Sequence, residues 1–221
     1  MLKSTKAVIF DLDGLLIDSE ATYQKAWQQA LAQMGYEFDE EFYQQLLGSD
    51  ARNVEKKLHH SLPSDFDLMV FRQLSAECWH TQVNQTGIPV MPGVEAVLYQ
   101  LQRLGWLTAV ATNSHQAQAH KLLQFAGLEH VFSHVFASDQ VANPKPAPDI
   151  YKFAADSLSL SPQDCLVLED SHIGVKAAVA AGMPCCWIPG FSTPSKVSEF
   201  TNCLVLDSLD QLAARLQQLS V

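Results

Sequence analysis

Four acidic residues stand where they could act together on a metal ion or a phosphate group. Asp11 and Asp13 follow a short apolar run in a segment closed by Gly14, and Glu169 and Asp170 end a second such run. Carboxylates brought close together repel one another, so their proximity makes sense where a hard divalent cation keeps them ionised. Mg²⁺ prefers oxygen ligands and retains several waters, which leaves room for a phosphate. We therefore predict a magnesium site built from these carboxylates.

Two further segments carry groups that could bind and neutralise a phosphate. Thr112, Asn113 and Ser114 follow an apolar run and precede a helical pattern, where hydroxyls and main-chain amides can hold an anion. Lys145 lies between two prolines in NPKPAPDIY. Taken singly, these are an ordinary helix cap and an ordinary surface lysine. Together with the carboxylates they supply the nucleophile, acid/base, cation and amides that phosphoryl transfer requires.

Six short runs of β-branched and apolar residues are the strands expected to position these groups. They lie at residues 7–10, 107–111, 134–137, 165–168, 184–188 and 203–206. Helix-length segments separate most of them, and strands that are apolar on both faces are typical of a parallel sheet covered by helices on both sides. We predict an α/β fold with a doubly wound parallel sheet. In such sheets the ligand lies beyond the carboxyl ends of the strands, where the polar segments fall.

Residues 17–86 interrupt this alternation of strands and helices. They contain amphipathic helical patterns rich in Gln, Glu, Lys and aromatic residues, and no clear strand pattern. We predict an inserted all-helical domain at 17–86 and a discontinuous α/β domain at 1–16 and 87–221. The second connection between them is TGIPVMPG, at residues 86–93. Paired linkers of this kind are typical of a hinged lid.

Composition narrows the classes of partner. The formal net charge is −10 at pH 7 and the pI is near 5.1, which disfavours a nucleic acid or an anionic membrane as ligand. No apolar run approaches the roughly 20 residues that span a bilayer, and the N-terminal segment lacks a signal-peptide profile. The five cysteines lack the paired spacing of a zinc site. We expect a cytoplasmic monomer whose ligand is a small phosphorylated metabolite.

Four motifs resemble the signature motifs of the haloacid dehalogenase superfamily. They are DxDGxxxDS at residues 11–19, ATNS at 111–114, KPxPxxY at 145–151 and LEDSxxG at 168–174. They occur in the family's order and extend over the whole predicted α/β domain. The helical insertion resembles the cap of the branch that contains phosphoglycolate phosphatases and β-phosphoglucomutases. The resemblance implies a Rossmann-like core with a helical cap, and a Mg²⁺-dependent phosphatase that forms an aspartyl-phosphate.

The resemblance also implies roles for the acidic residues. Asp11 corresponds to the nucleophile, and Asp13 to the general acid and then base, with its main-chain carbonyl also on Mg²⁺. Asp11 and Asp170 correspond to direct metal ligands, and Glu169 either binds the metal or lies just behind its ligands. The presence of Asp13 favours phosphate chemistry over dehalogenation, because phosphate chemistry needs that acid.

For the remaining motif residues the resemblance implies phosphate binding and support of the metal loop. Thr112 and the main-chain amide of Asn113 correspond to phosphate-binding groups. Lys145 corresponds to a catalytic and phosphate-binding cation that neutralises charge on the nucleophile and the phosphoryl group. Ser171 and Gly174 correspond to residues that shape the metal loop.

Substrate choice is expected to reside in the helical insertion, since the four motifs contact only the phosphoryl group. Tyr23, Trp27 and Arg52 are the candidate specificity residues, with Arg52 suited to a second anionic or hydroxylated group. Sugar phosphomutases of this family carry a catalytic histidine and a lysine where this sequence has Tyr23 and Leu47. These departures favour a phosphatase over a β-phosphoglucomutase-like mutase. A catalytically silent phosphate-binding protein is disfavoured because the motif residues are intact.

Overall fold

The computed structural model of the chain separates into two compact units. It describes residues 2–37, 39–44, 46, 57–58, 63, 66–189, 200 and 202–219. One unit consists of Met1–Asp18 and Pro89–Val221, and the other of Ser19–Ile88. Arg52 and Leu47 lie outside the described residues.

The first unit is built on a six-stranded sheet in which neighbouring strands are parallel, in the order β3-β2-β1-β4-β5-β6. The strands are β1 (Ala7–Phe10), β2 (Leu107–Ala111), β3 (Val135–Phe136), β4 (Cys165–Glu169), β5 (Cys185–Trp187) and β6 (Cys203–Val205). Each lies within one or two residues of a predicted apolar run. The prediction of a doubly wound parallel sheet is confirmed.

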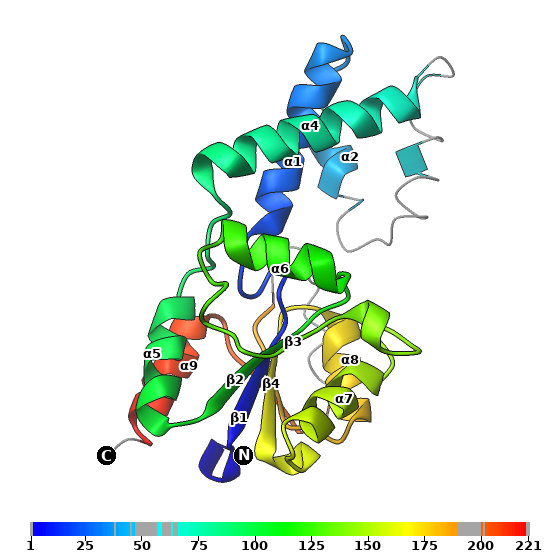
Figure 1. The fold of residues 1–221 in the computed structure, drawn as a ribbon. Coiled ribbons are helices and arrows are strands. Elements are labelled where there is room, and N and C mark those ends of the chain that lie inside the picture. The colour runs from blue at the N-terminus through cyan, green and yellow to red at the C-terminus, as the bar shows by residue number, and fades with distance from the viewer. Residues whose placement is uncertain are drawn as a thin grey trace. The chain divides into compact units, whose positions relative to one another are not determined.

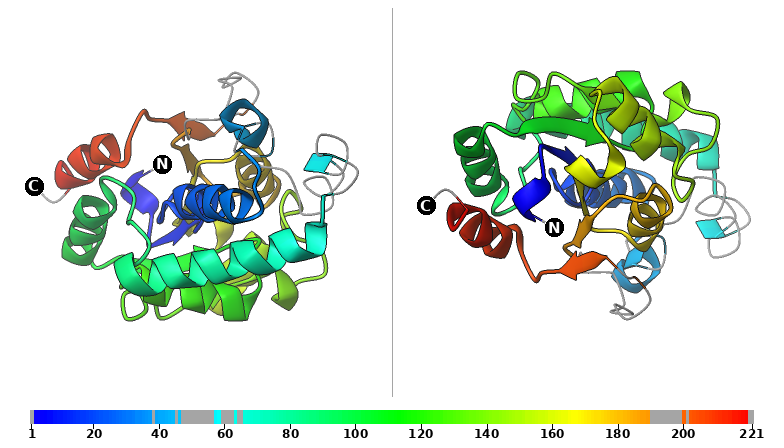
Figure 2. Two further views of the ribbon diagram at one scale, coloured as in Figure 1. Left: turned by 90° about the horizontal axis from the view of Figure 1, so that it is seen from above. Right: turned by 90° about the horizontal axis from the view of Figure 1, so that it is seen from below.

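Helices cover both faces of the sheet (Figures 1 and 2). They are α5 (Val94–Leu104), α6 (Gln116–Phe125), α7 (Asp149–Ser157), α8 (His172–Ala180) and α9 (Leu209–Gln217), with short 3₁₀ turns at Leu2–Ser4, Ser138–Gln140 and Pro162–Asp164. Helices α5 and α9 lie side by side on one face, and α7 and α8 lie on the other.

The central strands are buried on both faces, which explains their uninterrupted apolar sequences. Ala7 and Ile9 of β1 pack in one hydrophobic cluster with Ile150 of α7 and Val175 of α8. Val8, which points to the opposite face because side chains alternate along a strand, is 1% exposed. The sheet is therefore a rigid platform for whatever follows the ends of its strands.

The second unit consists of helices in the part of it that the structure describes: α1 (Ser19–Gln33), α2 (Glu40–Gln44) and α4 (Leu68–Thr86). Helix α4 begins where the Asp67 carboxylate accepts hydrogen bonds from the amides of Met69 and Val70, at 2.9 and 3.0 Å. A small hydrophobic cluster that includes Ala30 and Phe71 forms the core of this second unit. The predicted helical character of the insertion is confirmed. Within the described residues, no helix is both long and apolar enough to cross a bilayer.

Candidate active site

The pairing of β1 with its two neighbours brings three polar segments to one edge of the sheet. Phe10, the last residue of β1, pairs with Val110 of β2 and Leu168 of β4. The amide of Asp11 donates to the carbonyl of Leu168 at 3.0 Å, which carries the alignment one residue beyond the strand. The residues that follow these strands therefore emerge side by side at the carboxyl edge.

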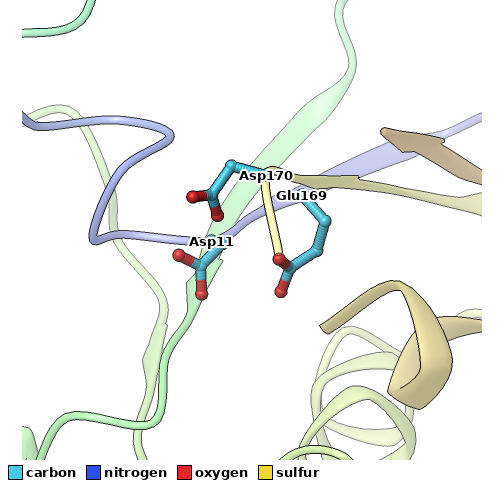
Figure 3. A group of neighbouring side chains, drawn as sticks. All are labelled: Asp11, Glu169 and Asp170. Atoms are coloured by element: carbon cyan, nitrogen blue, oxygen red, sulfur yellow. The ribbon is translucent and has the colours of Figure 1, made fainter. Parts of the chain in front are cut away.

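Three carboxylates converge at this edge, as Figure 3 shows. Asp11, Glu169 and Asp170 each offer an oxygen that lies within 4.8 Å of the oxygens offered by the other two. Asp11 comes from the end of β1, and the other two come from the end of β4. The sequence predicted these residues as a group, and the structure brings them together.

The Lys145 ammonium is bound from three directions. Its Nζ donates to Asp11 Oδ1 at 2.5 Å, to Glu169 Oε1 at 2.7 Å and to the carbonyl of Ala111 at 2.8 Å. An ammonium group has three N–H donors, so all three are engaged. The Lys145 side chain is 2% exposed. Lys145 is therefore fixed on Asp11 here, and donation to a phosphate oxygen would require exchange of one of these bonds.

Burial and charge crowding dominate the electrostatics of the cluster. Burial raises the pKa of Asp11 to about 8, because the ammonium of Lys145 only partly offsets the loss of water. Burial, with the charges of Asp11 and Glu169, also raises the pKa of Asp170 well above its ordinary value. Burial alone would lower the pKa of Lys145, but Asp11 and Glu169 outweigh it and raise that pKa. The single ammonium of Lys145 thus only partly neutralises the negative charge of the three carboxylates. A divalent cation that binds oxygen ligands fits this donor set.

Glu169 is buried and accepts hydrogen bonds at both carboxylate oxygens. Oε1 accepts from Lys145 and from the hydroxyl of Tyr151, both at 2.7 Å. Oε2 accepts from the amide and the hydroxyl of Ser171, at 3.2 and 2.9 Å. A Cβ atom at Gly174 would overlap this carboxylate, so the first turn of α8 needs glycine there. Glu169 therefore links Lys145 to the start of α8. It also lies beside Asp11 and Asp170, the two residues predicted to bind the metal directly.

The loop after β1 lies against both neighbouring strand ends. Asp13 Oδ2 accepts a hydrogen bond from the Ser114 hydroxyl at 3.1 Å. The amide of Ser114 donates in turn to Oγ1 of Thr112, which is 1% exposed, at 3.0 Å. Gly14 has a φ of +87°, and a Cβ there would collide with the Asp170 carboxylate. Glycine therefore lets the loop approach Asp170 closely.

Asn113 clamps the main chain of Lys145. Its Oδ1 accepts from the Lys145 amide at 2.9 Å, and its Nδ2 donates to the Lys145 carbonyl at 3.1 Å. The side chain thus pairs with both polar groups of a residue 32 positions away. The sequence predicted only a phosphate contact from the main-chain amide of Asn113. The side-chain function was missed, because a pairing across two loops leaves no local pattern.

Replacing Asn113 with Ala is expected to lower kcat for phosphate release by about 10- to 100-fold, since the clamp that places Lys145 is lost. Steady-state kinetics with an aryl phosphate measure the effect. The matched control is Asn143→Ala in the loop that carries Lys145, because Asn143 is exposed and its side-chain amide donates to Asp149 at 3.0 Å. Equal kinetics of the two variants would contradict the clamp.

The candidate specificity residues in the helical unit pack within that unit. The Tyr23 ring stacks on Trp79, with centroids 5.4 Å apart and an interplanar angle of 11°. The Trp27 ring makes edge contacts with Tyr43 and Phe71, at centroid distances of 5.6 and 5.2 Å. Trp27 packs against the unit's hydrophobic cluster. The roles of Tyr23 and Trp27 in specificity remain predictions, and Arg52 lies outside the described residues.

A doubly wound sheet with a lysine and carboxylate cluster at its carboxyl edge defines an α/β enzyme. The family model of the haloacid dehalogenase-like hydrolases matches residues 8–188, so the chain belongs to that family. The resemblance seen in the four motifs is confirmed. The match includes strands β2 to β5, most of β1 and the helical insertion, whereas β6 lies beyond it.

Known relatives carry phosphatase and phosphate-binding descriptions. The fructose-1-phosphate phosphatase YqaB of Escherichia coli K12 is 33% identical over 183 residues, which cover 83% of this chain and 96% of that protein. A haloacid dehalogenase family hydrolase from Deinococcus radiodurans, solved with phosphate and sodium bound, is 30% identical with a TM-score of 0.81, covering 97% and 96% of the chains. A Thermotoga maritima structure provisionally named β-phosphoglucomutase is 27% identical with a TM-score of 0.85, covering 97% and 99%.

Proposed function

We propose that this hydrolase is a Mg²⁺-dependent phosphatase that releases phosphate from a small phosphorylated metabolite, a sugar phosphate or a similar compound, through an aspartyl-phosphate on Asp11. The observation that supports this most strongly is the contact of Asp11 with a buried Lys145 in a cluster of three carboxylates. The name of the E. coli relative supports a sugar phosphate as substrate.

In the proposed reaction the Asp11 carboxylate attacks phosphorus while Lys145 holds one of its oxygens. Asp13 protonates the leaving oxygen, so the dephosphorylated alcohol departs. Asp13 then accepts a proton from a water molecule, which attacks the phosphorus of the aspartyl-phosphate and regenerates Asp11 with release of phosphate. The hydrogen bond from the Ser114 hydroxyl holds the Asp13 carboxylate beside the segment that follows β2, the strand that pairs with β1.

The residues that would hold Mg²⁺ are the carboxylates of Asp11 and Asp170 and the main-chain carbonyl of Asp13. Glu169 lies within the same cluster and supports it through Lys145. The ion would supply positive charge to the phosphoryl oxygens. The donor set consists of oxygens, as Mg²⁺ prefers, and its crowded carboxylates favour a divalent cation. Thr112 and the Asn113 amide are proposed to bind the phosphate, and Tyr23, Trp27 and Arg52 to contact the rest of the substrate.

Metal removal is expected to reduce the rate of phosphate release by at least about 100-fold. Of the two cations proposed to neutralise the negative charge of the phosphoryl group, Mg²⁺ and Lys145, Lys145 then remains by itself. Protein dialysed against EDTA is assayed with an aryl phosphate before and after addition of Mg²⁺, and activity is expected to return. The control receives EDTA already saturated with Mg²⁺. An unchanged rate in the metal-depleted protein would contradict magnesium dependence.

A sugar phosphomutase is the second candidate function, because the T. maritima neighbour carries that name. Against it, Tyr23 stands where the mutases of this family carry a catalytic histidine. A panel of phosphorylated metabolites separates the two functions: phosphate release from one or more sugar phosphates is expected. Isomerisation of a hexose 1-phosphate that requires a bisphosphate activator and outpaces hydrolysis would establish the mutase. A protein that binds phosphate esters without turning any of them over would overturn both.

A further inference from the structure

Tyr151 extends the cluster into the hydrophobic interior. Its side chain is 0% exposed and packs in the cluster formed by the sheet with α7 and α8. Its hydroxyl donates to Glu169 Oε1 at 2.7 Å. The same oxygen accepts from Lys145 Nζ at 2.7 Å, and Nζ also lies 4.9 Å from the centroid of the Tyr151 ring. Tyr151 thus contacts Lys145 through its ring and reaches it through Glu169.

From this geometry we infer that Tyr151 is a positioning residue: through Glu169 it holds the Lys145 ammonium against Asp11. The inference rests on the proposed phosphatase function, because Asp11 must be the group that reacts. The Tyr151 hydroxyl bonds to Glu169 and its ring faces Lys145, so Tyr151 acts on Asp11 through these two neighbours.

Packing alone does not explain the hydroxyl. The Tyr151 side chain belongs to a hydrophobic cluster that includes Ile150, Ala154, Val175 and Ala178, and a phenylalanine ring would serve equally well in that apolar packing. A buried hydroxyl costs free energy unless it finds a hydrogen-bond partner. The partner here is a carboxylate that also holds the catalytic lysine, which gives the hydroxyl a function beyond filling space.

The bonds on Glu169 explain how the effect would reach Lys145. Ser171 fixes Oε2 of Glu169, and Gly174 lies so close to the carboxylate that a Cβ there would overlap it. Tyr151 and Lys145 share Oε1. Without the Tyr151 hydroxyl, Lys145 is the remaining donor of the pair that shares Oε1. The Glu169 carboxylate can then rotate, or Oε1 can attract the ammonium more strongly. Lys145 then moves away from Asp11, and the nucleophile loses the cation that orients it.

The test is Tyr151→Phe, which keeps the ring and removes only the hydroxyl. With an aryl phosphate, kcat is expected to fall by about 10- to 100-fold and KM to change less than about twofold, since the substrate is not touched. The rate of aspartyl-phosphate formation in rapid-quench experiments is expected to fall by the same factor. Mg²⁺ affinity, measured by calorimetry, is expected to stay within about threefold of the wild type. The matched control is Tyr99→Phe on α5, because Tyr99 is 60% exposed.

A double substitution shows whether Tyr151 acts through Glu169. If it does, Tyr151→Phe lowers kcat less than about twofold further in a Glu169→Gln background, whereas independent effects would multiply. Wild-type kcat in folded Tyr151→Phe protein, or a loss explained entirely by a smaller folded fraction, would overturn the inference. If the wild-type protein hydrolyses no phosphate ester, the proposed function fails instead, so the two failures are distinguishable.

Discussion

The Asp11→Asn variant is expected to release phosphate at least roughly 10⁴-fold more slowly than the wild type, because an amide cannot serve as the nucleophile. The variant is expected to fold with undiminished stability, for two reasons. Its side-chain oxygen can still accept from Lys145, and removal of one charge relieves repulsion among three crowded carboxylates. Release of phosphate from an aryl phosphate measures activity, and thermal unfolding measures stability.

The control for this substitution is Asp156→Asn, since Asp156 is exposed on α7 and belongs to none of the four motifs. It is expected to retain wild-type kinetics. An Asp11→Asn protein within about tenfold of the wild-type rate would remove Asp11 from the chemistry, whatever its position in the cluster.

Lys145→Met is expected to damage both catalysis and folding. The side chain is 2% exposed and contacts Asp11 and Glu169, so the substitution leaves two buried carboxylates without their ammonium partner. Breaking a buried ion pair in this way costs about 3 to 5 kcal/mol of unfolding free energy. Loss of a preorganised charge at the reacting group is expected to lower kcat by about 10²- to 10³-fold. Denaturant titration and steady-state kinetics measure the two effects.

Lys152→Met provides the matched comparison, because Lys152 is exposed on α7, the helix that follows the Lys145 loop. It is expected to change the unfolding free energy by less than about 0.5 kcal/mol and to leave kcat unaltered. A Lys145→Met protein as stable as Lys152→Met would contradict the buried ion-pair cluster that the structure shows.

The strands could be predicted because burial on both faces leaves a simple signal. β1 and β2 begin and end at the predicted residues, since each is a compact apolar run followed at once by polar residues. β3 and β5 are shorter than predicted, because the hydrogen-bonded ladder at each stops before the apolar run does. Amphipathic patterns without a strand pattern likewise predicted the helical character of the insertion.

The site could be predicted only as far as sequence motifs and strand ends reach. Asp11, Glu169 and Asp170 were predicted together because carboxyl ends of parallel strands meet at one edge. The side-chain clamp of Asn113 and the shared acceptor of Tyr151 depend on distances between separate loops and helices, which no local pattern encodes. Tyr151 belonged to the KPxPxxY motif, but nothing in that spacing indicated that its hydroxyl would reach Glu169.

Trapping the phosphorylated enzyme tests the central claim most directly. Wild-type protein mixed with an aryl phosphate and Mg²⁺ is quenched in acid within the first turnover, digested and analysed by mass spectrometry. The predicted result is one phosphoryl group on the peptide that contains Asp11, absent from Asp11→Asn and longer-lived in Asp13→Asn, where the base for hydrolysis is missing. Phosphate release with no phosphoryl group on the protein at any quench time, or with the group on another residue, would contradict it.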